Sequence, residues 1–215
     1  MRLKTNLALL SLVTLLFVSC QKELSLDTIN GPVGGGPGGG GGGGSNSLIG
    51  NWKFLELTAN TESVVEATDG TDTEKAVTVS SYKSINNKGT IAFDATKVVS
   101  TGVGYDINDT AFAYLYANGV LLDSIDFPFT FTVPPSGGQS NYTVIGTDSI
   151  HFANSFLALP DVDPTGTQGG GAKFKIEGNI LTLTIISSTT ESETDQGVTT
   201  VTKNKVLGVI RMQRQ

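Results

Sequence analysis

The chain has 215 residues, of which 16% are charged, and its formal net charge at pH 7 is −6. A negative chain without a run of basic residues lacks the clustered positive surface that nucleic acids require, so we expect no nucleic-acid partner. The sequence contains one cysteine and one histidine, which exclude an intrachain disulfide and a metal cluster of Cys or His ligands. We therefore expect no metal site and no cofactor.

The N-terminus is typical of a secretory signal. Arg2 and Lys4 precede an almost wholly apolar stretch over residues 7–18. A bilayer-spanning helix needs about 20 apolar residues, so this stretch fits the apolar region of a signal peptide instead. It ends in Leu16-Phe17-Val18-Ser19-Cys20, which resembles the lipobox of bacterial lipoproteins. We predict a signal peptide over residues 1–19 and lipidation of Cys20; an ordinary signal peptide with an incidental cysteine is the alternative.

The lipoprotein resemblance also implies a location. Acyl chains on Cys20 would anchor the mature chain stably in a membrane. Residue 21 is Gln, whereas the family's inner-membrane retention signal is an Asp at this place, so the outer membrane is favoured and the leaflet stays open. We predict that residues 20–46 form a flexible tether. The fourteen residues of the glycine-rich segment 31–44 should behave as a coil that spans roughly 20 Å. Thr28 lies in an Asp-Thr-Ile pattern that resembles the acceptor sites of a periplasmic O-glycosylation system, and is a possible glycosylation site.

The remaining residues, 47–215, form one domain of all-β character. Segments rich in Thr, Val, Ile, Phe and Tyr alternate with clusters of Gly, Asn, Asp and Pro, and no long stretch has a helical period. Two hairpins can be placed in register. The Gly178-Asn179 loop pairs Phe174 with Leu183 and Ile176 with Leu181, and the loop 146–148 pairs Tyr142 with Phe152 and Val144 with Ile150. In each hairpin the apolar side chains share one face.

Other strands are less sharply defined. We expect them at residues 50–58, 75–82, 89–99, 111–118, 120–133, 196–203 and 205–213, with hairpin turns at Asn118-Gly119 and around Asn204. The total is about eight to ten strands in meander order, which suits an up-and-down barrel or a β-sandwich. We predict a single antiparallel barrel, with the sandwich as the alternative.

A short motif favours the barrel. Gly50-x-Trp52 on the first expected strand, followed by an arginine near the C-terminus, resembles lipocalins and the lipocalin-like domains of bacterial lipoproteins. The resemblance implies that Trp52 closes the barrel floor and that an arginine of the last strand packs over it. Arg211 is in the expected place, and Arg214 is the alternate.

Catalytic residues are scarce. His151 is the only histidine and falls on the strand face opposite Ile150 and Phe152. A Ser-His-Asp triad would have to be built on this one residue, and the spacing of the carboxylates does not demand acid–base chemistry. A solvated strand histidine is the simpler interpretation, and we expect no enzymatic activity.

Two functions remain open. A small barrel can hold one apolar or amphipathic small molecule at its mouth. The candidate ligand-lining residues are aromatic: Phe93, Phe127, Phe129, Phe131 and Tyr142. The alternative is a structural or interaction lipoprotein of the cell envelope, in which the same side chains fill the barrel and no ligand binds.

Overall fold

The computed structural model describes residues 47–157 and 169–215. Cys20, Thr28 and the expected signal peptide and tether therefore lie outside the described residues. Over the two described ranges no helix is long and apolar enough to cross a membrane. The strands are β1 (Gly50–Asp69), β2 (Asp72–Lys83), β3 (Ile85–Phe93), β4 (Lys97–Ala117), β5 (Val120–Ile145), β6 (Ser149–Phe152), β7 (Gly170–Glu177), β8 (Ile180–Asp195) and β9 (Val198–Arg214).

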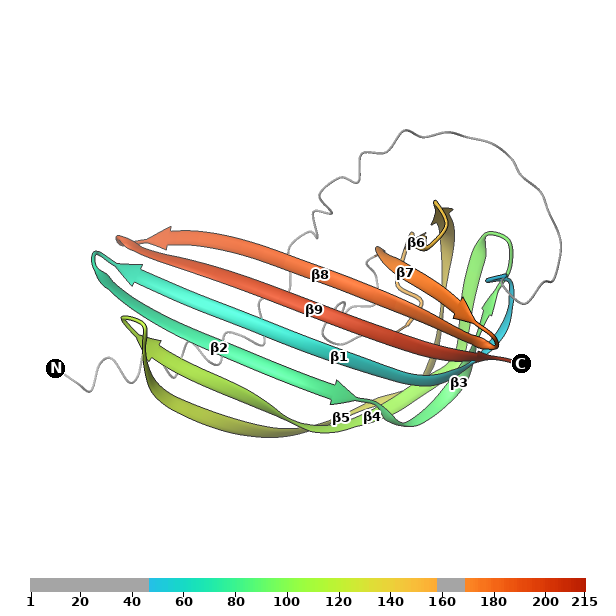
Figure 1. Ribbon diagram of the computed structural model, residues 1–215, viewed down its shortest axis with the longest axis horizontal. Helices are drawn as coiled ribbons and strands as arrows, with labels where there is room; N and C mark the ends of the chain where they lie inside the picture. Colours follow the sequence, from blue (N-terminus) through green and yellow to red (C-terminus); the bar gives the residue numbers. More distant parts are fainter. Residues whose placement is uncertain (1–46, 158–168) are drawn as a thin grey trace. The chain divides into compact units, whose positions relative to one another are not determined.

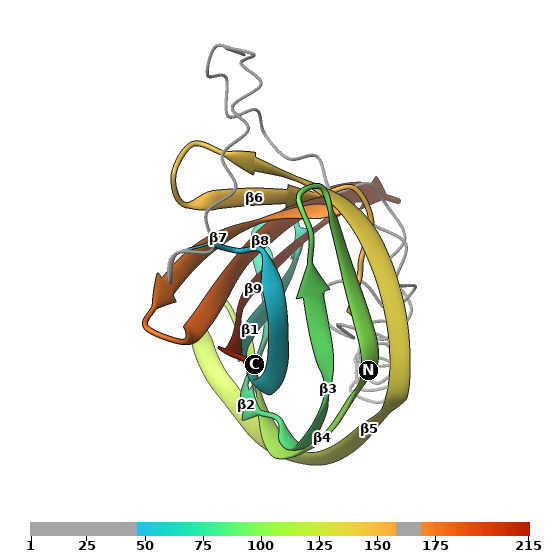
Figure 2. The same ribbon diagram turned by 90° about the vertical axis from the view of Figure 1, so that its right-hand side faces the viewer.

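All nine strands belong to one antiparallel sheet, with the order β2-β1-β3-β4-β5-β6-β7-β8-β9 and additional pairings of β1 with β9 and of β2 with β4. Because β1 also pairs with β9, the hydrogen-bonded strands from β1 through β3 to β9 form a closed ring. Figure 2 shows the strands arranged around this ring. The prediction of an all-β antiparallel fold is confirmed. The architecture is barrel-like, as expected, rather than a pair of stacked sheets.

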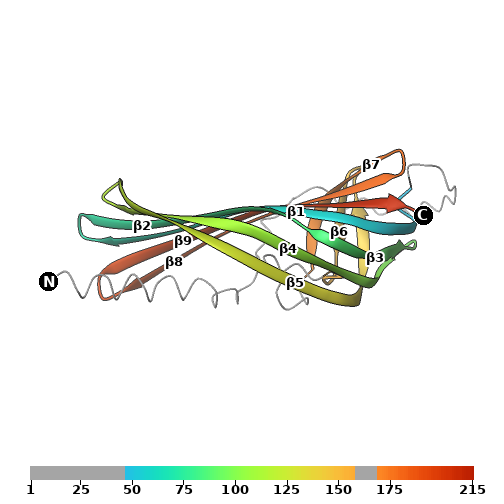
Figure 3. The same cartoon turned by 90° about the horizontal axis from the view of Figure 1, so that it is seen from below.

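The sheet has two parts, because β1 changes its neighbour along its length. Residues 50–53 pair with β3, and residues 58–69 pair with β2, which in turn pairs with β4. We call the part in which β3, β6 and β7 complete the ring the closed end. We call residues 58–83, 106–132 and 185–208 the wing, in which the order is β8-β9-β1-β2-β4-β5. The long strands of the wing extend well beyond β3, β6 and β7, and twist together (Figures 1 and 3).

The wing is an open sheet. β6 pairs with β5 only over residues 142–145, and β7 pairs with β8 only over residues 180–184. Among the described residues, the rest of β5 and β8 therefore has a strand neighbour on one side only. Pro128, Pro134 and Pro135 lie in β5, where an edge strand tolerates residues that cannot donate a backbone hydrogen bond.

The hydrophobic core lies mostly in the closed end. Trp52, Ile91, Leu181 and Met212 are fully buried there, and they come from four different strands of the ring. Successive side chains of a strand point to opposite faces of the sheet, so the face that carries these core residues can be followed along every strand as the inner face. In the wing this face carries the odd-numbered residues of β1, of which Ala59 and Val65 are buried. Their cross-strand partners on β2 and β9 share the face.

Local turn chemistry explains the predicted hairpins. Asn118 and Gly119 connect β4 to β5 with φ angles of 49° and 79°, and positive φ at both positions is the requirement of the tight two-residue turn that matches strand twist. The registers predicted for the hairpins at 178–179 and 146–148 are confirmed.

Two strand predictions are wrong. The expected strand 89–99 is broken after Phe93, because the Asp94 carboxylate accepts hydrogen bonds from the backbone N–H groups of Thr96 and Lys97 and forms a turn. The expected hairpin around Asn204 does not exist. Instead Asn204 lies within β9, where its side chain accepts a hydrogen bond from Ser63 of β1, and the turn falls earlier, at residues 196–197.

Candidate functional site

The Gly-x-Trp motif closes one end of the ring. Trp52 is 0% exposed, and its indole N–H donates to the carbonyl of Leu48 at 2.9 Å. The guanidinium of Arg214 lies over the indole ring, 4.3 Å from its centroid. Gly50 has a φ of 143°, and a Cβ at this position would be 3.1 Å from Nη1 of Arg214. Gly50 therefore gives the arginine room to reach the tryptophan.

Arg214, the alternate, is the residue that stacks on Trp52, so the expectation for Arg211 is wrong. The reason is the alternation of β9. Trp52 pairs directly with Arg214, and Met212 and Ile210 point inward with it, which places Arg211 on the outer face. Arg214 also donates to the backbone carbonyls of Ser47 and Ile49. The last strand is thereby tied to the segment that enters the first.

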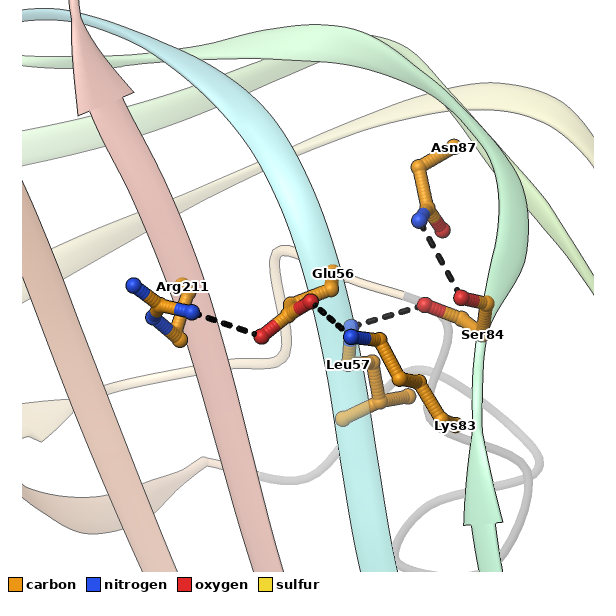
Figure 4. A network of polar contacts seen from close by, with 6 residues as sticks. All are labelled: Glu56, Leu57, Lys83, Ser84, Asn87 and Arg211. Atoms are coloured by element: carbon orange, nitrogen blue, oxygen red, sulfur yellow. Dashed lines mark hydrogen bonds and ion pairs between the residues drawn. The ribbon is translucent and has the colours of Figure 1, made fainter.

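Arg211 belongs to a polar cluster on the outer face, at the point where the sheet divides (Figure 4). Glu56 forms ion pairs with Lys83 at 2.6 Å and with Arg211 at 3.0 Å. The hydrogen bond from Lys83 lowers the pKa of Glu56, burial opposes this effect, and the hydrogen bond from Arg211 lowers the pKa further. The cluster links β1, β2 and β9 beside the bulge between Phe54 and Glu56.

Buried Ser84 stabilises the same junction of β1, β2 and β3 through hydrogen bonds to Leu57. The hydroxyl of Ser84 accepts the backbone N–H of Leu57 at 2.7 Å, and the backbone N–H of Ser84 donates to the carbonyl of Leu57 at 2.8 Å. The chain leaves β2 here and enters β3, so these two bonds satisfy backbone groups at the place where β1 changes partners. Figure 4 shows Ser84 held from its other side by Asn87, whose amide donates to the Ser84 carbonyl.

Two of the five candidate ligand-lining residues lie in the packed core of the closed end. The ring of Phe93 is 5.5 Å from that of Tyr142 and 6.3 Å from that of Phe156. Phe152 completes the group at 4.7 Å from Phe156. Burial raises the pKa of Tyr142, the Asp94 carboxylate raises it further, and the Tyr142 hydroxyl donates to the carbonyl of Asp94. Phe93 and Tyr142 thus pack against other side chains of this protein.

The other three candidates lie together on the wing. Phe127, Phe129 and Phe131 alternate along β5, opposite Ala111, Asp109 and Ile107 of β4. Phe129 is partly buried and packs edge-on against Tyr82, at 6.2 Å between ring centroids. Phe127 and Phe131 are 39% and 44% exposed. The structure therefore separates the five residues into a buried pair and an inner-face stripe on an edge strand.

The sequence offered His151 and the carboxylates as the groups that catalytic or metal chemistry could use. His151 is exposed, pairs across the strands with Thr143 and points away from Ile150 and Phe152, as expected. Within residues 47–157 and 169–215 no group of three or more His, Cys, Asp or Glu side chains is arranged to hold a metal ion.

Comparisons with known proteins identify no relative. No protein-family model matches the sequence, and no curated protein is detectably similar to it. Among solved structures, the chain is similar to Ail, the attachment invasion locus protein of Yersinia pestis, with 8% sequence identity over 76% of this chain and 99% of that chain. The TM-score is 0.16, and a superposition this poor supports no argument about fold or function.

Sequence reasoning missed the cluster around Glu56 and the carboxylate of Asp109 beside the phenylalanines. For Asp109 the Asn118-Gly119 turn is an insufficient signal, because the bulge between Leu115 and Tyr116 shifts the register, and without that bulge Asp109 would oppose Pro128 and not Phe129. For Glu56 none existed, because its partners lie 27 and 155 residues away along the chain.

Proposed function

We propose that this chain is a lipid-anchored, lipocalin-like binding module of the outer membrane, without enzymatic activity, that holds an apolar or amphipathic small molecule. One observation carries the proposal. Phe127 and Phe131 stay 39% and 44% exposed on the inner face of the sheet, with Phe129 between them. Exposed aromatic side chains in a contiguous stripe mark a binding surface more often than single exposed residues do.

The anchor in this proposal rests on the N-terminal sequence, in which an apolar stretch ends at Ser19-Cys20. The lipocalin-like part rests on Gly50, Trp52 and the arginine stacked over the indole ring. Because side chains of the chain itself fill the closed end, we assign the ligand to the wing and not to the interior beside Trp52.

The second candidate is a structural or interaction lipoprotein without a ligand. The packing of the closed end favours it, since Phe93, Tyr142, Phe152 and Phe156 occupy the interior of the ring in contact with one another. The two candidates differ in what they expect of the wing. A binding module uses the phenylalanine stripe, whereas a filled barrel does not.

Photolabelling tests the binding function. The full chain in phosphatidylcholine nanodiscs is exposed to a decyl maltoside that carries a diazirine in its alkyl chain, and labelled peptides are mapped by mass spectrometry. We expect saturable labelling of residues 120–132, lost in the Phe127→Ser/Phe131→Ser variant. The control is Ile186→Ser/Leu207→Ser, which removes two exposed apolar side chains from the outer face and should leave labelling unchanged. Absence of saturable labelling in the wild-type wing would favour the filled barrel.

The anchor has its own test. Metabolic labelling with an alkyne palmitate should tag the wild-type chain, and Cys20→Ala should abolish both the tag and recovery in the membrane fraction. Unchanged fractionation of the Cys20→Ala chain would overturn the lipid anchor and leave the binding surface untouched.

A further inference from the structure

The two faces of the wing differ in charge. The lysines of the wing are Lys75, Lys83, Lys203 and Lys205. They pair across the strands with Glu66, Thr58, Val64 and Glu62, which are even-numbered residues of β1 and so belong to the outer face. The wing ranges contain no arginine and no histidine. Every cationic side chain of the wing therefore lies on the outer face.

The inner face carries carboxylates instead. Glu191 of β8 is opposite Thr202, which is opposite the buried Val65. On the other side of Val65 the same row continues through Ala76 and Leu115 and ends at Asp123 of β5. Both edges of this row across the wing are therefore acidic. Glu74 and Glu193 occupy inner-face positions in the next row, on either side of Ala67.

Two inner-face carboxylates, Asp109 and Asp123, adjoin the phenylalanine stripe. Asp109 lies directly opposite Phe129, and directly opposed side chains have Cβ atoms about 4.5–5.5 Å apart. Asp123 is two residues from Ile125 on the same face of β5, and Ile125 is 39% exposed. Neither carboxylate has a cationic partner on its own face of the wing. An apolar stripe with one carboxylate beside its middle, another beyond its Phe127 end and no cation beside it is complementary to an apolar group that carries a positive charge.

A second copy of this chain would be a poor occupant of the same surface. It would bring two carboxylate-bearing inner faces together, and like charges in contact are unfavourable. Pairing through the edge of β5 is opposed by Pro128 and by the consecutive Pro134 and Pro135. The charge of the inner face therefore selects a partner of opposite sign.

We propose that the inner face of the wing binds a small cationic amphiphile, whose apolar chain lies along Phe127, Phe129 and Phe131 and whose ammonium group lies beside Asp109 or Asp123. This inference rests on the proposed binding function and names the chemical class of its ligand. The recognition is electrostatic at the head group and apolar along the chain. It therefore weakens with salt, because exposed carboxylates are screened at high ionic strength.

Three diazirine-bearing probes with the same decyl chain test the inference: decyltrimethylammonium, decyl maltoside and decanoate. Each is titrated against the full chain in phosphatidylcholine nanodiscs, with empty nanodiscs as the blank. At low salt we expect half-saturation of labelling at residues 120–132 at about tenfold lower concentration for the cation than for decyl maltoside, the low end of the enrichment that a surface of one charge sign produces. Decanoate should label least, and high salt should remove the ranking.

Two double variants with the same change in net charge test whether Asp109 and Asp123 cause the preference for the cationic probe. Asp109→Asn/Asp123→Asn should abolish the preference for the cation and leave labelling by decyl maltoside unchanged. Asparagine still accepts the hydrogen bonds that Thr110 and Ser124 donate to these side chains, so the local backbone is kept. Glu66→Gln/Asp126→Asn removes two exposed carboxylates from the outer face and should keep the preference.

The outcomes separate this inference from the function on which it rests. Equal half-saturation for the three probes, or a cation preference that survives in Asp109→Asn/Asp123→Asn, overturns the cationic ligand and leaves a binding surface without charge selectivity. Failure of all three probes to label the wing overturns the proposed binding function itself.

Discussion

The closed end and the wing are built from the same strands but bury their inner faces differently. At the closed end β1 presents Trp52 and Phe54 inward, and β9 presents Met212 and Ile210. In the wing the same two strands present Ser63 and Thr61, and Asn204 and Thr202. The short strands β6 and β7 complete the ring only at the closed end, and most of the fully buried side chains lie there.

Ring closure, and not strand length, therefore determines where the core forms. A strand can continue beyond the core when its hydrogen bonds are satisfied by neighbours, and its inner side chains can then be small or polar. The wing thus has backbone order without a continuous apolar interior. The inner face of the wing therefore stays partly exposed, whereas the inner face of the closed end is occupied by its own aromatic residues.

The largest expected effect comes from Trp52→Ala. Removing a fully buried aromatic side chain should lower the free energy of unfolding by ~3–5 kcal/mol. Phe127→Ala in the wing is the matched comparison, and should cost about 1 kcal/mol because the side chain is 39% exposed. Urea unfolding followed by circular dichroism measures both. Equal losses would mean that the wing contributes to the core as much as the closed end does.

Gly50→Ala tests the backbone of the closed end. An alanine at a φ of 143° is strained, and its Cβ would displace the Arg214 guanidinium from the tryptophan. We expect a loss of about 2 kcal/mol. Gly70→Ala is the control in the wing, because its φ is also positive, at 59°, but nothing lies within 4 Å of the added Cβ. A loss at Gly50 no larger than that at Gly70 would show that contact with Arg214 adds no cost.

The two arginines of β9 should differ because they lie on opposite faces. Arg214→Ala removes the stack on Trp52 and should cost ~1–2 kcal/mol. Arg211→Ala removes a half-exposed ion pair and should cost ~0–1 kcal/mol. In double-mutant cycles with Trp52→Ala, only Arg214→Ala should be non-additive. Coupling of Trp52 to Arg211 instead would contradict the observed alternation of the strand.

Sequence reasoning succeeded where the determinants are local. The hairpins at 178–179 and 146–148 follow from turn residues flanked by alternating apolar residues, and both registers are confirmed. The same alternation could have identified the stacking arginine. Ile210, Met212 and Arg214 are every second residue of β9 and share one face, whereas Arg211 lies on the other face. The location of the first strand beside the last also followed from the sequence.

The division of the sheet could not be predicted. Residues 58–69 of β1 and 186–195 of β8 are rich in Thr, Ser and Glu on both faces, so period-2 alternation does not mark them as strands. The insertion of β2 between β1 and β4 depends on pairings between segments up to 45 residues apart, for which no local signal exists. The wing, and with it the face that carries Asp109 and the phenylalanines, became visible only in the structure.

The smallest expected effect concerns the Glu56 cluster, where the two parts meet. The pKa of Glu56 is lowered in the folded protein, first by the hydrogen bond from Lys83, against the opposing effect of burial, and then by Arg211. A carboxyl group with a lowered pKa contributes stability above its unfolded pKa, near 4.5, and loses that contribution as the pH falls through the lower folded value.

Glu56→Gln should therefore cost about 1 kcal/mol or less at pH 7, and the difference from wild type should shrink below pH 4.5. Urea unfolding at several pH values measures this. Glu66→Gln, an exposed change on the same face of β1, should give a smaller difference at pH 7. If the Glu56→Gln difference stayed constant down to pH 3, the side chain would stabilise the junction by packing and not by charge.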